Sequence, residues 1–86
     1  MPFLLPISVT QDNVSQLEKE GFLNLASLRM VDCAQLQDFD STVLTLLLAW
    51  QKKLQSHQQQ LTVINAPEKL KVLASVYGVS VLLGLS

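Results

Sequence analysis

The sequence is poor in the residues that most often build catalytic and metal sites. Among its 86 residues are one cysteine, Cys33, and one histidine, His57. A single cysteine excludes an internal disulfide and is typical of a reducing compartment. A lone histidine with neither a second ligand nor a nucleophile supports no metal site and no catalytic triad. We therefore expect a protein that is not an enzyme and that uses no cofactor and no metal.

Charge of one sign and closely spaced glycines are also scarce. Six basic and seven acidic residues give a formal net charge of −1, too little positive charge to attract a phosphate backbone. The three glycines, at positions 21, 78 and 84, are too far apart to form a phosphate-binding loop. We expect no nucleic acid among the partners.

Long hydrophobic runs are missing too. The longest, at 43–50, has eight residues and is interrupted by Thr45, whereas a membrane-spanning helix needs about 20. The N-terminal MPFLLPISV has no positive charge and contains two prolines, which is not typical of a signal peptide. These observations predict no direct membrane span and a cytoplasmic location.

The hydrophobic content is nevertheless high enough for a folded core. It reaches 49%, with a mean hydropathy of +0.32, which predicts a single domain over residues 1–86. The N-terminal third predicts a strand over 5–10 and then a short helix capped by Asp12 or Asn13. Residues 22–25 fit either a continuation of that helix or a connection.

From residue 28 onward, the hydrophobic pattern predicts the order βαβαβ. The expected elements are a central strand at 28–33, a helix at 41–56, a strand at 61–64, a helix from about 67 to Gly78 and a final strand at 79–83. Asn65 and Glu68 have the spacing of a capping box, with Pro67 in the first turn. This order predicts an α/β fold, a small mixed or parallel sheet flanked by helices, and leaves open whether one or both faces are covered.

The two longer helices have clear apolar stripes. In the helix at 41–56, Val43, Leu47, Trp50 and Leu54 fall on one side and are expected in the core. In the following helix the expected core stripe consists of Leu70, Leu73, Ala74 and Tyr77.

Polar residues gather where the helix at 41–56 begins. Asp40, Ser41 and Thr42 can cap the helix, because their side-chain oxygens satisfy the free amides of a first turn. The same position suits a phosphorylated hydroxyl, which the helix dipole would favour and the neighbouring acids would oppose. Capping alone and a regulatory or docking role both remain open.

Leu48 stands away from the apolar stripe of this helix. It lies about 140° from Val43 on the helical wheel, near Thr45, Ala49 and Lys52. An exposed leucine can be incidental. Beside the hydroxyl pair, it indicates an interaction surface.

Two segments of the sequence resemble the STAS domain family (sulfate transporter and anti-sigma factor antagonist). LRMVDCAQLQDFDSTVLTLLLAW is similar to that family's strand, its D-S-[ST]-G motif and its apolar helix, and LTVINAPEKLKVLASVYGVS is similar to the strand, turn, helix and final strand that follow. The resemblance covers roughly residues 28–83 and implies the STAS fold. The part before Leu28 is shorter than is usual in the family, which predicts a reduced or absent first strand.

The resemblance implies one of two roles. Anti-sigma factor antagonists are phosphorylated in the D-S-[ST]-G motif, where Thr42 matches the phosphoacceptor. In the MlaB-like group of ABC transporter subunits, to which the sequence looks closer, Ser41 matches a hydroxyl at the contact with the ATPase. Val43 replaces the family's usual glycine, and we expect its side chain to crowd a kinase.

We therefore expect a non-catalytic subunit that binds the cytoplasmic, MlaF-like ATPase of a phospholipid-transporting ABC complex. The permease and lipid-binding subunits are indirect partners, and the ATPase holds the chain at the cytoplasmic face of the inner membrane. The alternative is an anti-sigma factor antagonist switched by phosphorylation at Thr42 or Ser41. The expected partner-binding residues are Asp40, Ser41, Thr42, Thr45, Leu48 and Lys52.

Overall fold

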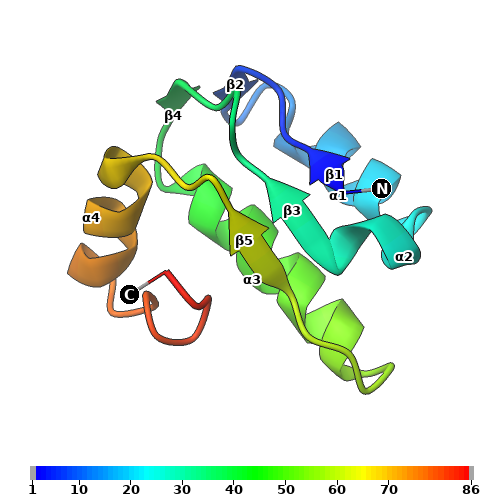
Figure 1. The fold of residues 1–86 in the computed structure, drawn as a ribbon. Helices are drawn as coiled ribbons and strands as arrows, with labels where there is room; N and C mark the ends of the chain where they lie inside the picture. The colour runs from blue at the N-terminus through cyan, green and yellow to red at the C-terminus, as the bar shows by residue number, and fades with distance from the viewer. Residues whose placement is uncertain (1, 86) are drawn as a thin grey trace.

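The structure, a computed structural model, describes residues 2–85 and is a small α/β fold (Figure 1). This confirms the fold class expected from the sequence. Its elements in chain order are β1 (Phe3–Leu4), β2 (Ser8–Val9), α1 (Val14–Phe22), α2 (Leu25–Leu28), β3 (Met30–Asp32), β4 (Asp38–Phe39), α3 (Thr42–Gln55), β5 (Thr62–Ile64) and α4 (Glu68–Val76).

The strands form two small parallel sheets. The larger has the order β1-β3-β5, so that Val31 of β3 pairs with Phe3 on one side and with Val63 on the other. The smaller joins β2 to β4. Parallel neighbours need a crossover between them, and α3 lies in the crossover that links β3 and β5. The expected central strand is therefore central, and the first strand is reduced to two residues.

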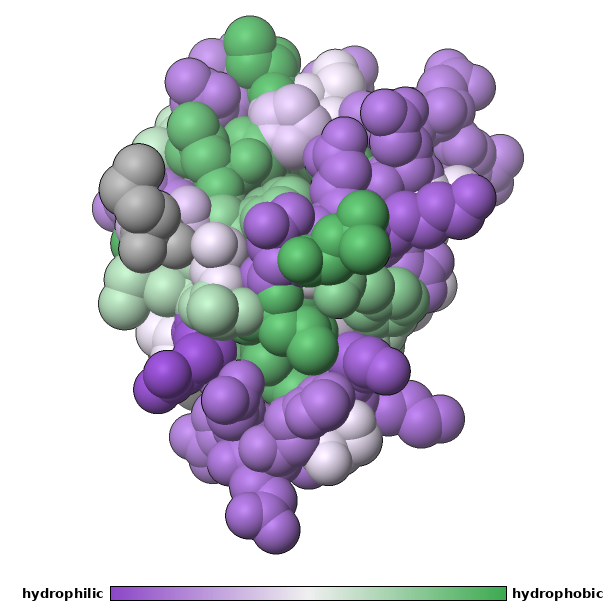
Figure 2. All heavy atoms as spheres, turned by 90° about the vertical axis from the view of Figure 1, so that its right-hand side faces the viewer, coloured by the Kyte–Doolittle hydropathy of each residue, from purple (hydrophilic) through white to green (hydrophobic). Residues whose placement is uncertain are grey.

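Helices α1 and α3 cover one face of the larger sheet (Figure 1). Val31 points toward them and is fully buried, whereas Leu4 and Met30 are 48% and 43% exposed on the other face. Figure 2, which shows the molecule from the side of α2, has its hydrophobic side chains in separate groups bordered by polar ones. The burial of Val31 and the exposure of Leu4 and Met30 indicate that the larger sheet has one packed face and one open face.

Trp50 of α3 lies at the centre of the packed layer. It is fully buried, its ring meets that of Phe3 edge-on at 5.0 Å, and its Nε1 donates to the backbone oxygen of Glu18 at 3.3 Å. Gly21 lets α1 approach the indole, because a Cβ at this position would overlap the ring. The predicted core stripe of α3, Val43, Leu47, Trp50 and Leu54, is confirmed as fully buried.

The strand predicted at 5–10 is wrong in extent. Strand β1 precedes this range and β2 lies within it, because the chain leaves one sheet for the other around Pro6, which has no N–H to donate. Leu28 belongs to α2 rather than to the central strand. The sequence pattern also missed β4, since two residues are too few to show a period.

The expected capping box at Asn65 is wrong as well. Asn65 adopts a positive φ of 56°, and its side-chain amide donates to Asp32 Oδ1 at 3.0 Å. The N-cap position of α4 is occupied by Pro67 instead. Asn13 does hold the N-cap position of α1. Its side chain accepts from the amide of Thr10 and donates to the backbone oxygen of Ser8, so it closes the preceding turn instead of bonding the helix.

The final strand expected at 79–83 is not formed within the described residues. Gly78, at a φ of 71°, ends α4 as expected, and the amide of Val79 donates back to the oxygen of Ala74 at 2.9 Å, as in a Schellman motif. Residues 79–85 then close a turn in which the amide of Leu85 donates to the oxygen of Ser80. The backbone groups that a strand needs are therefore used locally.

No helix within residues 2–85 combines the length and the apolar character that crossing a membrane requires.

The close approach at Gly21 predicts a loss of stability in Gly21→Ala. Alanine usually favours a helix by about 1 kcal/mol over glycine, but the overlap with the buried indole should outweigh this gain and lower the free energy of unfolding by about 1–3 kcal/mol. Urea denaturation measures the change. Ser15→Ala, on the exposed side of α1, is the control and should not be destabilised. A Gly21→Ala variant as stable as the wild type would contradict this packing.

Candidate partner-binding site

Helix α3 begins with a carboxylate that bonds the backbone. Ser41 occupies the N-cap position, but its side chain makes no capping bond. Instead, Asp40 Oδ1 accepts from the amide of Thr42 at 2.8 Å. Of the three residues expected to satisfy amides of the first turn, Asp40 is the one that does so through its side chain.

This bonding keeps Asp40 charged. Hydrogen bonds from the Thr42 side chain and from its backbone lower the pKa of the Asp40 carboxyl, which is fully exposed. Ser41 is exposed beside this negative charge, and Thr42 is half-buried. The start of α3 therefore presents one ionised carboxylate and one accessible hydroxyl to solvent.

A small groove lies next to this helix start, between α3 and the end of α4. We call it the α3–α4 groove. It has a volume of about 220 Å³, which is below the usual range of small-molecule pockets and suits a single inserted side chain. Its lining residues are Ser41, Leu44, Thr45, Leu48, Tyr77 and Val79.

The structure brings only part of the predicted set together. Ser41, Thr45 and Leu48 line the α3–α4 groove. Asp40 and Thr42 are the sequence neighbours of Ser41 at the start of α3 but do not line the groove. Lys52 lines a different hollow, against α1. Leu48, expected to be exposed, is half-buried because one side of it packs on the core.

Sequence reasoning missed Tyr77 and Val79 as parts of this site. Tyr77 was assigned to the core stripe of α4 but is 59% exposed, whereas Leu70 and Ala74 of that stripe are fully buried. The signal was Gly78: a helix that ends there by a Schellman motif reverses the chain, and Val79 then returns toward α3.

The expectation that the side chain of Val43 would crowd a kinase is wrong. Its side chain is fully buried in the core, so it points away from the surface where a partner or a kinase would approach. A branched residue here leaves the outer side of the first turn open.

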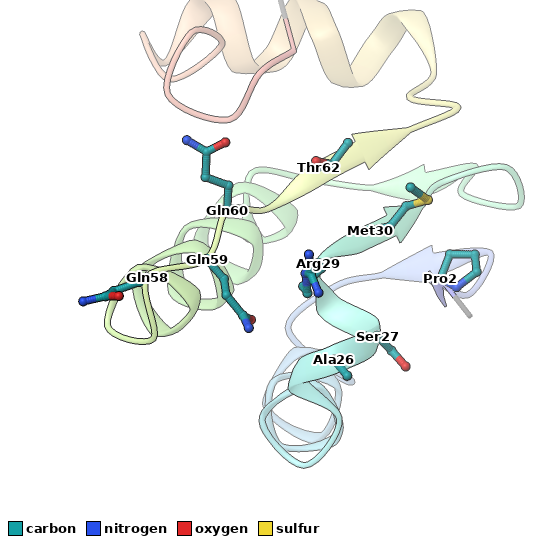
Figure 3. Close-up of a pocket in the computed structure, with 9 residues that line it drawn as sticks. All are labelled: Pro2, Ala26, Ser27, Arg29, Met30, Gln58, Gln59, Gln60 and Thr62. Carbon is teal, nitrogen blue, oxygen red and sulfur yellow. The ribbon is translucent and has the colours of Figure 1, made fainter.

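A further hollow, of about 770 Å³, lies beyond the other end of α3 (Figure 3). The side chains of Gln58 and Gln60 point away from Arg29 rather than toward it. Because these polar groups do not converge on one point, the hollow has no defined ligand geometry. Its lining residues are Pro2, Ala26, Ser27, Arg29, Met30, Gln58, Gln59, Gln60 and Thr62.

Cys33 and His57 do not form a reactive pair. Burial and, secondarily, the charge of Asp32 raise the pKa of the Cys33 thiol to about 12, so the thiol stays protonated and is a poor nucleophile. His57 is exposed, just beyond the end of α3. Within residues 2–85, no three His, Cys, Asp or Glu side chains gather as a metal site would require.

The lowered pKa of Asp40 predicts how Asp40→Ala changes stability with pH. A carboxyl whose pKa is lowered by folding stabilises the fold above its unfolded pKa of about 3.9, and this contribution is lost as the pH falls through the folded pKa. The melting temperature of Asp40→Ala should therefore be below that of the wild type at pH 7, and the difference should shrink below about pH 4. A difference that stays constant down to pH 2 would contradict the capping role.

Comparison with known proteins identifies the family of the chain. A family model described as "Mlab, STAS domain" matches residues 8–84. A search of curated protein sequences gave no match. STAS domains mediate protein–protein interactions and are generally binding or regulatory domains without catalysis of their own. With the match extending over most of its length, the chain belongs to the STAS domain family.

Proposed function

We propose that this chain is a non-catalytic subunit that binds the MlaF-like ATPase of an ABC transporter moving phospholipids between the inner and outer membranes. The observation that carries the proposal is the α3–α4 groove, where Leu48 and Tyr77 form an apolar hollow beside the exposed Ser41 and Thr45. The family description, which names Mlab, supports the same role.

The contact surface in this proposal is the outer side of α3. An apolar side chain of the ATPase enters the groove against Leu48 and Tyr77, while the hydroxyls of Ser41 and Thr45 supply polar contacts at its rim. Asp40 adds an ionised carboxylate beyond the groove, which favours a basic residue of the partner. Aromatic anchors in small pockets commonly carry much of an interface's binding energy.

The mechanism in this proposal is allosteric. A subunit that binds one conformation of the ATPase more tightly than another shifts its population in proportion to the difference in binding free energy. The chain acts on the permease and lipid-binding subunits only indirectly, through the ATPase. The ATPase also holds the chain at the cytoplasmic face of the inner membrane. The chain itself contributes no step of ATP hydrolysis.

Binding to the purified ATPase tests the proposal. Leu48→Asp combined with Thr42→Glu places charge in and beside the groove, and should weaken binding by roughly 30-fold or more, the loss expected from a hot spot. Calorimetry measures the affinity, and thermal unfolding checks that the variant folds. Met30→Asp is the control, since Met30 is 43% exposed on the opposite sheet face. Unchanged affinity in the double variant would contradict the assigned interface.

One observation favours the phosphorylation switch as a second candidate. Ser41 is exposed at the start of α3, and the buried Val43 leaves it accessible, although a phosphate there would face the negative charge of Asp40. Thr42 is less available, since its hydroxyl bonds that carboxylate.

Mass spectrometry of the chain isolated from its native cells separates the two candidates. An anti-sigma factor antagonist should have a substantial phosphorylated fraction at Ser41 or Thr42, and this signal should be lost in Ser41→Ala or in Thr42→Ala. A transporter subunit should have none. Complete absence of phosphate under several growth conditions would argue against the switch.

A further inference from the structure

Helix α3 has a second hollow on its other flank. It lies between α1 and α3 and has a volume of about 350 Å³, and we call it the α1–α3 groove. Its lining residues are Glu18, Phe22, Ala49, Lys52, Lys53 and Ser56. The α3–α4 groove lies along the first half of α3, and the α1–α3 groove lies along the second half.

An exposed ridge of α3 separates the two grooves. Thr45, at the edge of the α3–α4 groove, and Lys52, at the edge of the α1–α3 groove, are seven residues apart along this ridge and are both exposed. Leu48 lies on one side of it and Ala49 on the other, as their places in the two grooves show. The grooves are therefore arranged diagonally across the helix, with the small side chain of Ala49 near the crossing point.

The α1–α3 groove combines an apolar floor with basic residues at its rim. Phe22 and Ala49 are half-buried, whereas Lys52 and Lys53 are exposed. Glu18, the acidic residue of the lining, comes from α1 and is half-buried. The rim thus favours carboxylates on whatever fills the groove.

We propose that one amphipathic helix of the partner fills both grooves, crossing α3 obliquely over Ala49 and directing carboxylates at Lys52 and Lys53. The proposal rests on the proposed function, since the α3–α4 groove is the contact assigned there. A straight partner helix can reach two hollows that are arranged diagonally, because helices packed on one another commonly cross at an angle. Between Ser41 and Ser56, α3 rises about 22 Å along its axis, so a helix that reaches both grooves needs at least roughly four turns.

Charge reversal at the rim tests this inference with the same purified ATPase. Lys52→Glu should weaken binding about fivefold, the effect of losing an exposed ion pair. Lys71→Glu is the matched control, because it makes the same charge change at an exposed position on α4. In Lys52→Gln/Lys53→Gln, the affinity should also depend less on salt than in the wild type, since the screened ion pairs are gone.

The outcomes separate the two proposals. If Leu48→Asp abolishes binding but Lys52→Glu weakens it no more than Lys71→Glu does, the acidic helix is refuted and the proposed function stands. If the wild type does not bind the ATPase at all, both proposals fail. A larger loss in Lys52→Glu than in Lys71→Glu, together with reduced salt dependence in the glutamine variant, supports the inference.

Discussion

Burial of Trp50 is the constraint on which the orientation of α3 depends. The indole is enclosed between Phe3 of β1 and Gly21 of α1, and its N–H is satisfied by the backbone oxygen of Glu18. A tryptophan bound in this way fixes the rotation of the helix about its axis. The residues on the opposite side, among them Thr45 and Lys52, must then face solvent. The surface available to a partner is thus a consequence of core packing.

A chain reversal completes that surface. Gly78 adopts the left-handed conformation that ends α4, and the hydrogen bonds of the Schellman motif direct Val79 back toward α3. The side chain of Gln51, on α3, donates to the backbone oxygen of Leu82 and ties the following turn to the same helix. Tyr77 and Val79 reach Leu48 through these local bonds, although they are far from it in the sequence.

Prediction from the sequence succeeded where a pattern was long and failed where it was short. The bounds of α3 were predicted to within about a residue, because its apolar stripe repeats over several turns. Strands of two residues show no period, so β1 and β4 were missed or misplaced. The segment at 79–83 has strand-like composition, yet local hydrogen bonds hold it as a turn. Composition there gave no information on which backbone groups would be paired.

The sequence by itself determined the α/β class, the buried side of α3 and the polar start of that helix, because each depends on neighbours within a few turns. Only the tertiary structure decided that Asn65 bonds Asp32, 33 residues away, and that Tyr77 lines a groove with Leu48. Such contacts depend on how a parallel sheet closes and on which surfaces remain uncovered afterwards. The periodicity of a short segment contains no information on either, because these contacts join residues that are far apart in the sequence.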